Sequence, residues 1–119
     1  MQQLKKIFVV LMLAVSTLTS LAQFNKNNND PDAAFKTAKE YWQKEQYSLA
    51  FPIFKSLYHQ SLNKSNLPVH IQTESKYYML VGGLWLNDAS VEPLAIEFIE
   101  LEANAHKVGI MSFHLAEYY

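Results

Sequence analysis

The sequence predicts an all-α fold built from helix–turn–helix hairpins, and three observations lead to it. No segment alternates between apolar and polar residues for long enough to form a β-strand. Apolar residues instead recur at steps of three and four in successive segments that short polar turns separate. Small and aromatic residues also recur at fixed distances within these segments. This pattern favours antiparallel hairpins stacked as a short α-solenoid over residues 31–119.

Residues 1–22 have the features of a signal peptide. Lys5 and Lys6 precede an apolar run over residues 7–15, and the small residues Ser20 and Ala22 suit a cleavage site before residue 23. The run is too short to cross a bilayer, which takes about 20 residues. We therefore expect export to the periplasm or outer envelope and no stable membrane span in the mature chain. An uncleaved membrane anchor is the alternative.

Composition narrows the class of protein further. The 119 residues suffice for one domain, half of them are apolar, and there is no cysteine for disulfides or thiolate metal sites. All ten cationic residues are lysines, and loss of Lys5 and Lys6 leaves eight of them against eleven Asp and Glu, a net charge of −3. Nucleic-acid binding usually needs a basic face and often arginine, so we expect no nucleic-acid partner.

The first helix follows a flexible, Asn-rich leader at residues 23–30. Asp30 can serve as N-cap and Pro31 suits the first helical position, where a missing backbone N–H costs little. One apolar face then continues to a stop near Glu45 and Gln46, and it consists of Ala34, Phe35, Ala38, Tyr41 and Trp42.

Two more helices are expected over residues 48–86. Ser48 is the predicted N-cap of the second helix, and Pro52 falls in its first turn or just past it. Residues 60–66 are polar and predict a loop that ends at Leu67 and Pro68. The third helix is predicted from Val69 to Leu86, where Asn87 and Asp88 break it.

The last two predicted helices complete the chain. Ser90, with Pro93 near the start, opens a fourth helix that reaches Leu101. Residues 102–107 are predicted to form a turn, and a fifth helix covers residues 108–119. The apolar pattern of this fifth helix is still running at Tyr119.

The spacing around Ala38 recurs along the chain. Tyr41, Tyr47, Ala50 and Phe54 follow Ala38 by 3, 9, 12 and 16 residues. With Gly82 in the role of Ala38, the same offsets fall on Trp85, Val91, Leu94 and Phe98, and with Ala116 in that role Tyr119 follows by three. Gly82 lies 44 residues after Ala38, and Ala116 lies 34 residues after Gly82.

In this spacing the chain resembles the tetratricopeptide repeat family, whose unit is a 34-residue helix–turn–helix with small residues at the helix crossings. The unit beginning near Ala38 is the closest to the family pattern, whereas Leu94 stands where the second unit should have a small residue. The resemblance implies that residues 31–119 are an array incomplete at its C-terminus, so we expect an N-terminal fragment of a longer protein or a truncated gene product. A generic irregular helical bundle is the alternative.

No residue pattern indicates bond chemistry. The four histidines include no pair at i, i+4 and no HExxH arrangement, so no metal site or cofactor is predicted. The acidic residues of the fourth predicted helix are typical of a solvated face. No nucleophile elbow or phosphate-binding loop occurs, and the chain is predicted not to be an enzyme.

The resemblance implies a non-catalytic scaffold or adaptor that binds a protein or peptide in a groove formed by the first helix of each hairpin. Lys39, Gln43, Lys76 and Tyr77 lie on those helices outside the core stripe and are the candidate contact residues. Some aromatic residues of the inner helices are expected to line the groove and the rest to pack in the core: Tyr77, Tyr78, Trp85, Tyr118 and Tyr119. The alternatives are a helical accessory region of a larger exported enzyme or nutrient-binding protein, and a small exported enzyme.

Overall fold

The computed structural model describes residues 30–63 and 66–119. The signal peptide predicted over residues 1–22, and all of the predicted leader except Asp30, lie outside the described residues. Residues 31–119 form one compact unit.

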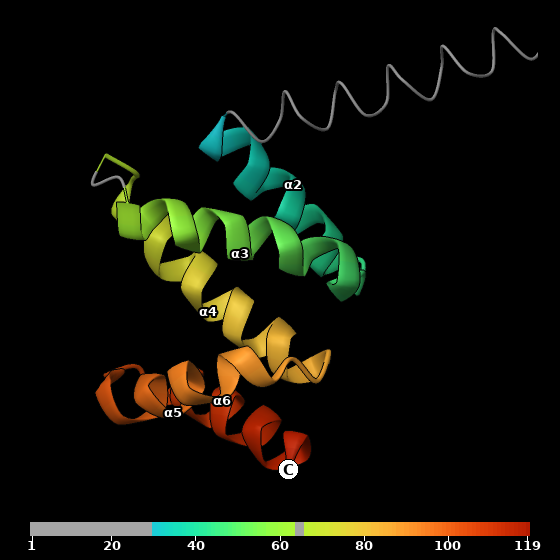
Figure 1. The fold of residues 1–119 in the computed structure, drawn as a ribbon, viewed down its shortest axis with the longest axis vertical. Coiled ribbons are helices and arrows are strands. Elements are labelled where there is room, and N and C mark those ends of the chain that lie inside the picture. The colour runs from blue at the N-terminus through green and yellow to red at the C-terminus, as the bar shows by residue number, and fades with distance from the viewer. Residues whose placement is uncertain (1–29, 64–65) are drawn as a thin grey trace, which may run out of the picture. The chain divides into compact units, whose positions relative to one another are not determined.

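The described residues form α-helices and one 3₁₀ turn, and they contain no β-strand. The elements are α2 (Pro31–Gln43), α3 (Tyr47–Asn63), α4 (Val69–Trp85), η1 (Ala89–Val91), α5 (Glu92–Leu101) and α6 (Ala105–Tyr118). Figure 1 shows them in chain order from α2 in cyan to α6 in red. The prediction of an all-α fold is confirmed.

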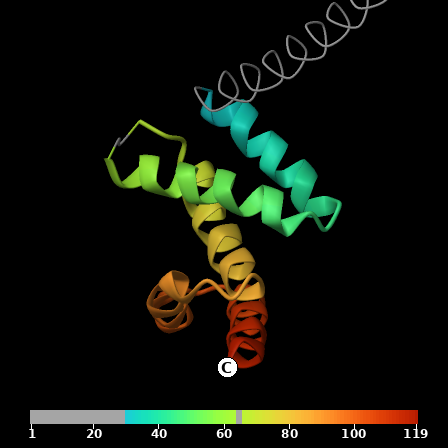
Figure 2. The same ribbon diagram turned by 45° about the vertical axis from the view of Figure 1, so that its right-hand side comes forward.

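Helix α4 is the central element of the unit. Helix α3 packs against α2 and α4, while α4 also contacts α5 and α6. Figures 1 and 2 show α4 between the α2–α3 pair and the α5–α6 pair. Its residues Leu80 and Leu84 are accordingly at most 2 % exposed. The core therefore runs through both pairs without a break at α4.

Phe54 joins the first three helices. Its ring is fully buried on α3. It contacts Phe35 and Trp42 of α2 at centroid distances of 6.1 and 6.2 Å, and it stacks on Tyr78 of α4 at 4.9 Å. The small residues Ala38 and Ala50 are also fully buried, which lets the two backbones of the first hairpin approach closely.

The turns after α2 and α4 have the same geometry. Glu45 and Asn87 both have a φ of 59°, the left-handed conformation that ends many helices. The next residue then donates its N–H five positions back, from Gln46 to the Tyr41 carbonyl at 2.9 Å and from Asp88 to that of Gly83 at 2.8 Å. The two turns are thus equivalent, and they lie 42 residues apart.

The second helices of the two hairpins are offset by a different distance. Helix α3 begins at Tyr47 and α5 at Glu92, 45 residues later. The three residues of η1, which have no counterpart between α2 and α3, account for the difference between 42 and 45. A single period therefore does not relate the two hairpins.

This geometry corrects the register predicted for the second unit. The turn offset of 42 residues makes Leu80 the counterpart of Ala38. The helix-start offset of 45 residues makes Ala95 the counterpart of Ala50. All four residues are fully buried. Assigning the role of Ala38 to Gly82 at 44 residues is wrong, because Gly82 faces Trp42 and Phe51 of the preceding hairpin.

Two predicted helix starts also move. Ser48 lies inside α3 rather than capping it, and Pro52 lies at the sixth position of that helix. In the second hairpin Ser90 does not cap α5, which begins at Glu92 without a side-chain cap. The Asp88 carboxylate instead caps η1, where it accepts the Ser90 N–H at 2.9 Å and the Ser90 hydroxyl at 2.6 Å. The expected proximity of Pro93 to the start of α5 is confirmed.

Helices α3 and α6 are longer than predicted. Helix α3 continues to Asn63, through much of the segment expected to be a loop. Helix α6 begins at Ala105 instead of Val108, because the side chain of Asn104 accepts the N–H groups of His106 and Lys107 at 3.1 and 3.2 Å. The Asn104 cap was therefore the missing signal for that start.

Candidate functional site

Helices α2 and α4 lie side by side and run parallel. Three contacts join α2 to α4: Phe35 with His70, Lys39 with Glu74, and Trp42 with Tyr78. The two residues of each pair are 35 or 36 positions apart, so residue numbers increase in the same direction along both helices. Their distances are 6.1 Å between ring centroids, 3.9 Å between Nζ and Oε2, and 4.9 Å between ring centroids. The first helices of the two hairpins are thus direct neighbours.

Helix α6 continues this arrangement on the other flank of α4. The ammonium group of Lys107 lies 5.2 Å from the ring centroid of Tyr77, and the imidazole of His114 lies 6.2 Å from that of Trp85. Residue numbers again increase in the same direction along both helices, so α4 and α6 are parallel as well. Helices α2, α4 and α6 therefore form a row of parallel helices.

A small aromatic hollow lies along this row. We call it the aromatic hollow, and it is lined by Trp42, Tyr47, Val81, Trp85 and His114. Its volume is about 60 Å³. Tyr47 contacts both indoles, with centroid distances of 4.7 Å to Trp42 and 5.6 Å to Trp85. The hollow is thus built from residues of α2, α3, α4 and α6.

The polarity of the aromatic hollow suits an apolar group. Val81 is almost fully buried, whereas the Trp85 ring is 54 % exposed and accessible from solvent. No Asp, Glu or Lys lines the hollow, and its polar groups are indole N–H groups, a phenol and an imidazole. Such a surface removes water from an apolar side chain and still offers hydrogen bonds at its edge.

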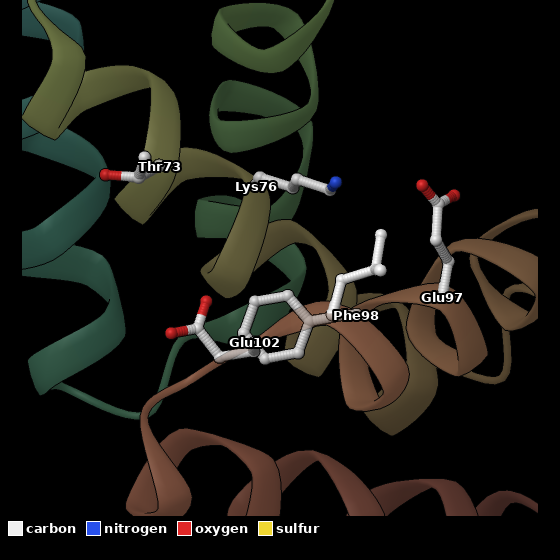
Figure 3. Close-up of a pocket in the computed structure, with 6 residues that line it drawn as sticks. Thr73, Lys76, Glu97, Phe98 and Glu102 are labelled. Atoms are coloured by element: carbon white, nitrogen blue, oxygen red, sulfur yellow. The ribbon is translucent and has the colours of Figure 1, made fainter.

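A second hollow of about 190 Å³ lies between α4 and α5. Thr73, Lys76, Glu97, Phe98, Leu101 and Glu102 line it. Figure 3 shows Lys76 extending from α4 in the direction of Glu97, with the Phe98 ring below them. The Thr73 hydroxyl donates to the Val69 carbonyl at 3.0 Å and is used within its own helix. This hollow therefore offers charges of both signs around one aromatic ring.

The structure places two of the four predicted contact residues, Lys39 and Gln43, on α2 and the other two, Lys76 and Tyr77, on α4. Lys39 pairs with Glu74 between α2 and α4, and Gln43 is exposed at the end of α2. Lys76 lines the α4–α5 hollow. Tyr77 is partly buried beside Phe98, at a centroid distance of 5.8 Å.

Tyr77 is held in its neutral form. Burial, and to a lesser degree the nearby Tyr78 hydroxyl, raise the pKa of Tyr77 above its ordinary value. The hydroxyl therefore remains a hydrogen-bond donor at neutral pH. The ring also lies beneath the Lys107 ammonium, so Tyr77 contributes to the packing of α4 against α6.

Sequence reasoning missed four residues of the aromatic hollow, because only Trp85 was among the candidate groove residues. The other four are Trp42, Tyr47, Val81 and His114. Trp42 and Tyr47 are close in sequence on either side of the turn after α2, and this was the available signal. His114 had no such signal, because only the packing of α6 beside α4 brings it to Trp85.

Two further properties concern the described residues alone. They contain no group of three or more His, Cys, Asp or Glu residues placed to hold a metal ion. None of their helices combines the length and apolar character needed to cross a bilayer.

Comparison with known proteins gave no match to a protein-family model, to a curated protein sequence or to a solved structure. The candidate site therefore rests on the geometry of this chain.

Proposed function

We propose that this chain is a tetratricopeptide-like protein-binding scaffold or adaptor that holds a segment of another protein along the row formed by α2, α4 and α6. The observation that carries the proposal is the aromatic hollow, where two tryptophans, a tyrosine and a histidine surround a recess on that row. Parallel neighbouring first helices are the arrangement that stacked hairpins produce. In this proposal no bond is made or broken.

The size of the hollow defines the anchor that it accepts. A hollow of about 60 Å³ is much smaller than the roughly 300–1,000 Å³ of a pocket for a drug-sized ligand. The tip of one aliphatic side chain fits this space. Residues flanking the anchor in the bound segment would contact the Lys39–Glu74 pair farther along α2 and α4. A short peptide with one apolar anchor is therefore the expected ligand.

Capture from envelope extract tests the binding proposal. The wild-type chain should retain a partner, and Trp85→Ala should weaken that partner's binding at least tenfold, about 1.4 kcal/mol, because buried tryptophans are frequent hot spots. Trp85 is 54 % exposed, so the substitution leaves the core in place. Both tryptophans of the chain line the hollow, and the purified partner should therefore shift the intrinsic fluorescence.

Leu101→Ala is the matched control, since Leu101 is 74 % exposed and lines the hollow between α4 and α5. It should bind the partner like the wild type. Loss of binding in Leu101→Ala together with normal binding in Trp85→Ala would move the site to that second hollow and refute the assignment to the aromatic hollow.

We also propose that residues 1–22 direct export to the periplasm or outer envelope. Expression of the full chain in a Gram-negative host should yield a periplasmic product that begins at Gln23, as measured by intact mass. Replacement of Ala22 by Arg should block cleavage, because the peptidase pocket accepts small residues. A full-length chain that stays in the cytoplasm would contradict this part of the proposal.

A further inference from the structure

Helix α6 carries an apolar face that the other described elements cover only in part, where Ile110 packs against the core. Ile110 is partly exposed and Phe113 is 59 % exposed. A shallow hollow of about 380 Å³ follows this face, and all of its lining residues belong to α6: Ala105, His106, Gly109, Ile110, Phe113 and His114. The opposite face of α6 is used, because Met111 is fully buried there.

Gly109 indicates that something approaches this face closely. A Cβ added at Gly109 would meet no atom within 4 Å, whereas Gly82 and Gly83 both have close neighbours. Packing within the described chain therefore gives no reason for glycine at this position. A glycine inside a helix costs about 1 kcal/mol relative to alanine. It permits, however, an unusually close approach of another backbone.

The polar residues at the two ends of the same face, His106 and Glu117, are complementary to those of a second copy. His106, Ile110, Phe113 and Glu117 follow each other at steps of four, three and four, which places them on one stripe of the helix. His106 and Glu117, the titratable groups of this stripe, stand at its two ends. Two copies of α6 packed antiparallel about the point between residues 111 and 112 would place His106 opposite Glu117 of the second copy.

We propose that this face of α6 binds α6 of a second copy of the chain in a two-fold antiparallel arrangement. Each Phe113 then packs against Ile110 and the open backbone at Gly109 of the other copy. Each His106 imidazole donates a hydrogen bond to the opposite Glu117 carboxylate. The surface pairs with itself because every contact occurs twice.

The size of the face sets the strength of the dimer. Helix α6 has 14 residues and is about 21 Å long, at 1.5 Å per residue. One helix of this length buries less than the roughly 800 Å² per partner of a standard interface. The dimer should therefore be weak, and its population should rise with protein concentration.

Sedimentation of the full chain at increasing concentration provides the first test. The wild type should pass from monomer to dimer, and Gly109→Leu should raise the dimer dissociation constant more than tenfold. The leucine has open space within its own chain, so the helix content and unfolding midpoint should not fall. Leu62→Ala, at a position that is 64 % exposed on α3, is the control and should dimerise like the wild type.

Disulfide trapping tests the direction and register, because the chain contains no cysteine. A mixture of His106→Cys and Glu117→Cys chains should form a cross-linked dimer on mild oxidation, since the two positions face each other across the interface. Neither variant should cross-link alone. In an antiparallel dimer of two identical variant chains, the two cysteines lie about 16 Å apart along the helix. This exceeds the roughly 7 Å Cα separation that a disulfide can span.

Two results would overturn the proposal. Efficient cross-linking of either variant with itself would require parallel pairing of the helices. A wild-type chain that stays monomeric at its highest soluble concentration would exclude the second copy as the occupant of this face and assign the face to another protein. His114 lines both this face and the aromatic hollow, but none of the substituted positions 106, 109 and 117 lines the aromatic hollow, so the proposed binding function is tested separately.

Discussion

Gly83 shows how a single missing side chain decides a local packing arrangement. A Cβ added there would lie 2.6 and 2.7 Å from the two methyl groups of Val91, closer than real contacts allow. Val91 is itself 2 % exposed within η1, so it has little space in which to move. The close approach of α4 and η1 therefore requires glycine at this position.

We expect Gly83→Ala to lower the free energy of unfolding by about 1–3 kcal/mol, in the range of an overpacked core. The gain of about 1 kcal/mol in helix propensity is included in this net loss. Gly109→Ala is the matched control, because its methyl group meets open space and should raise the unfolding free energy by up to about 1 kcal/mol. Urea titration distinguishes the two, and equal effects would contradict the assigned contact.

Ser75 is a second residue whose role lies in the packing. It is fully buried on α4, and its hydroxyl has no hydrogen-bond partner among the described residues. An unpaired buried hydroxyl costs about 1–3 kcal/mol. The periodicity of α4 alone did not reveal that this polar residue faces the core.

At the scale of single elements, side-chain caps mark the starts of η1 and α6, whereas α4 and α5 begin without one. The Asp88 carboxylate accepts two hydrogen bonds from Ser90 and lies 4.0 Å from the Lys55 ammonium group. The side-chain hydrogen bond from Ser90 is the main cause that lowers the pKa of Asp88, followed by the Ser90 backbone N–H. Lys55 makes a smaller contribution in the same direction.

Asp88→Ala should lower the free energy of unfolding at pH 7 by about 1 kcal/mol, as for other lost N-caps. A carboxylate whose pKa is lowered in the folded state stabilises it at pH values above its unfolded pKa, close to 3.8. That contribution disappears as the pH falls through the folded pKa. Urea titrations of wild type and variant should therefore converge below pH 3.8.

Asp88→Asn is the control for this experiment, because asparagine also caps helices and does not titrate. Its difference from Asp88→Ala should stay constant with pH. A wild-type advantage over Asp88→Ala that persists unchanged at low pH would contradict the role of the ionised carboxylate.

At the scale of the whole molecule, α4 lies between the α2–α3 pair and the α5–α6 pair and couples them. Phe54 packs between α2 and α4, and α4 in turn contacts α5 and α6. Removal of a side chain from this junction should therefore destabilise the entire described unit. Hairpins that stack through a continuous core differ in this respect from independent domains.

Phe54→Ala should lower the free energy of unfolding by about 3–5 kcal/mol, a large part of the 5–15 kcal/mol typical of a domain. Tryptophan fluorescence, which reports on α2 and α4, and far-ultraviolet circular dichroism, which reports on all helices, should give the same lowered midpoint. Separate midpoints would show that the α5–α6 pair unfolds independently. Ile96→Ala, on an exposed position of α5, should change the midpoint little.

Much of the fold was predictable, because its signals are local. Proline and polar residues mark the ends of helices, and apolar periodicity marks their buried faces. The register of the second hairpin was not predictable in this way. Gly82 and Leu94 matched a linear spacing, but the three-residue η1 inserts an offset that only the turn geometry at Asn87 reveals.

The sequence by itself determined that this chain is helical, where most of its helices lie, and which small residues permit the first hairpin to close. These properties depend on neighbours within a few turns of the same helix. The tertiary structure alone decided that Trp42, Tyr47, Trp85 and His114 meet in one hollow, and that Gly109 and Phe113 share an uncovered face. Such surfaces depend on how α2, α4 and α6 align with one another, and that alignment results from side-chain packing between distant segments.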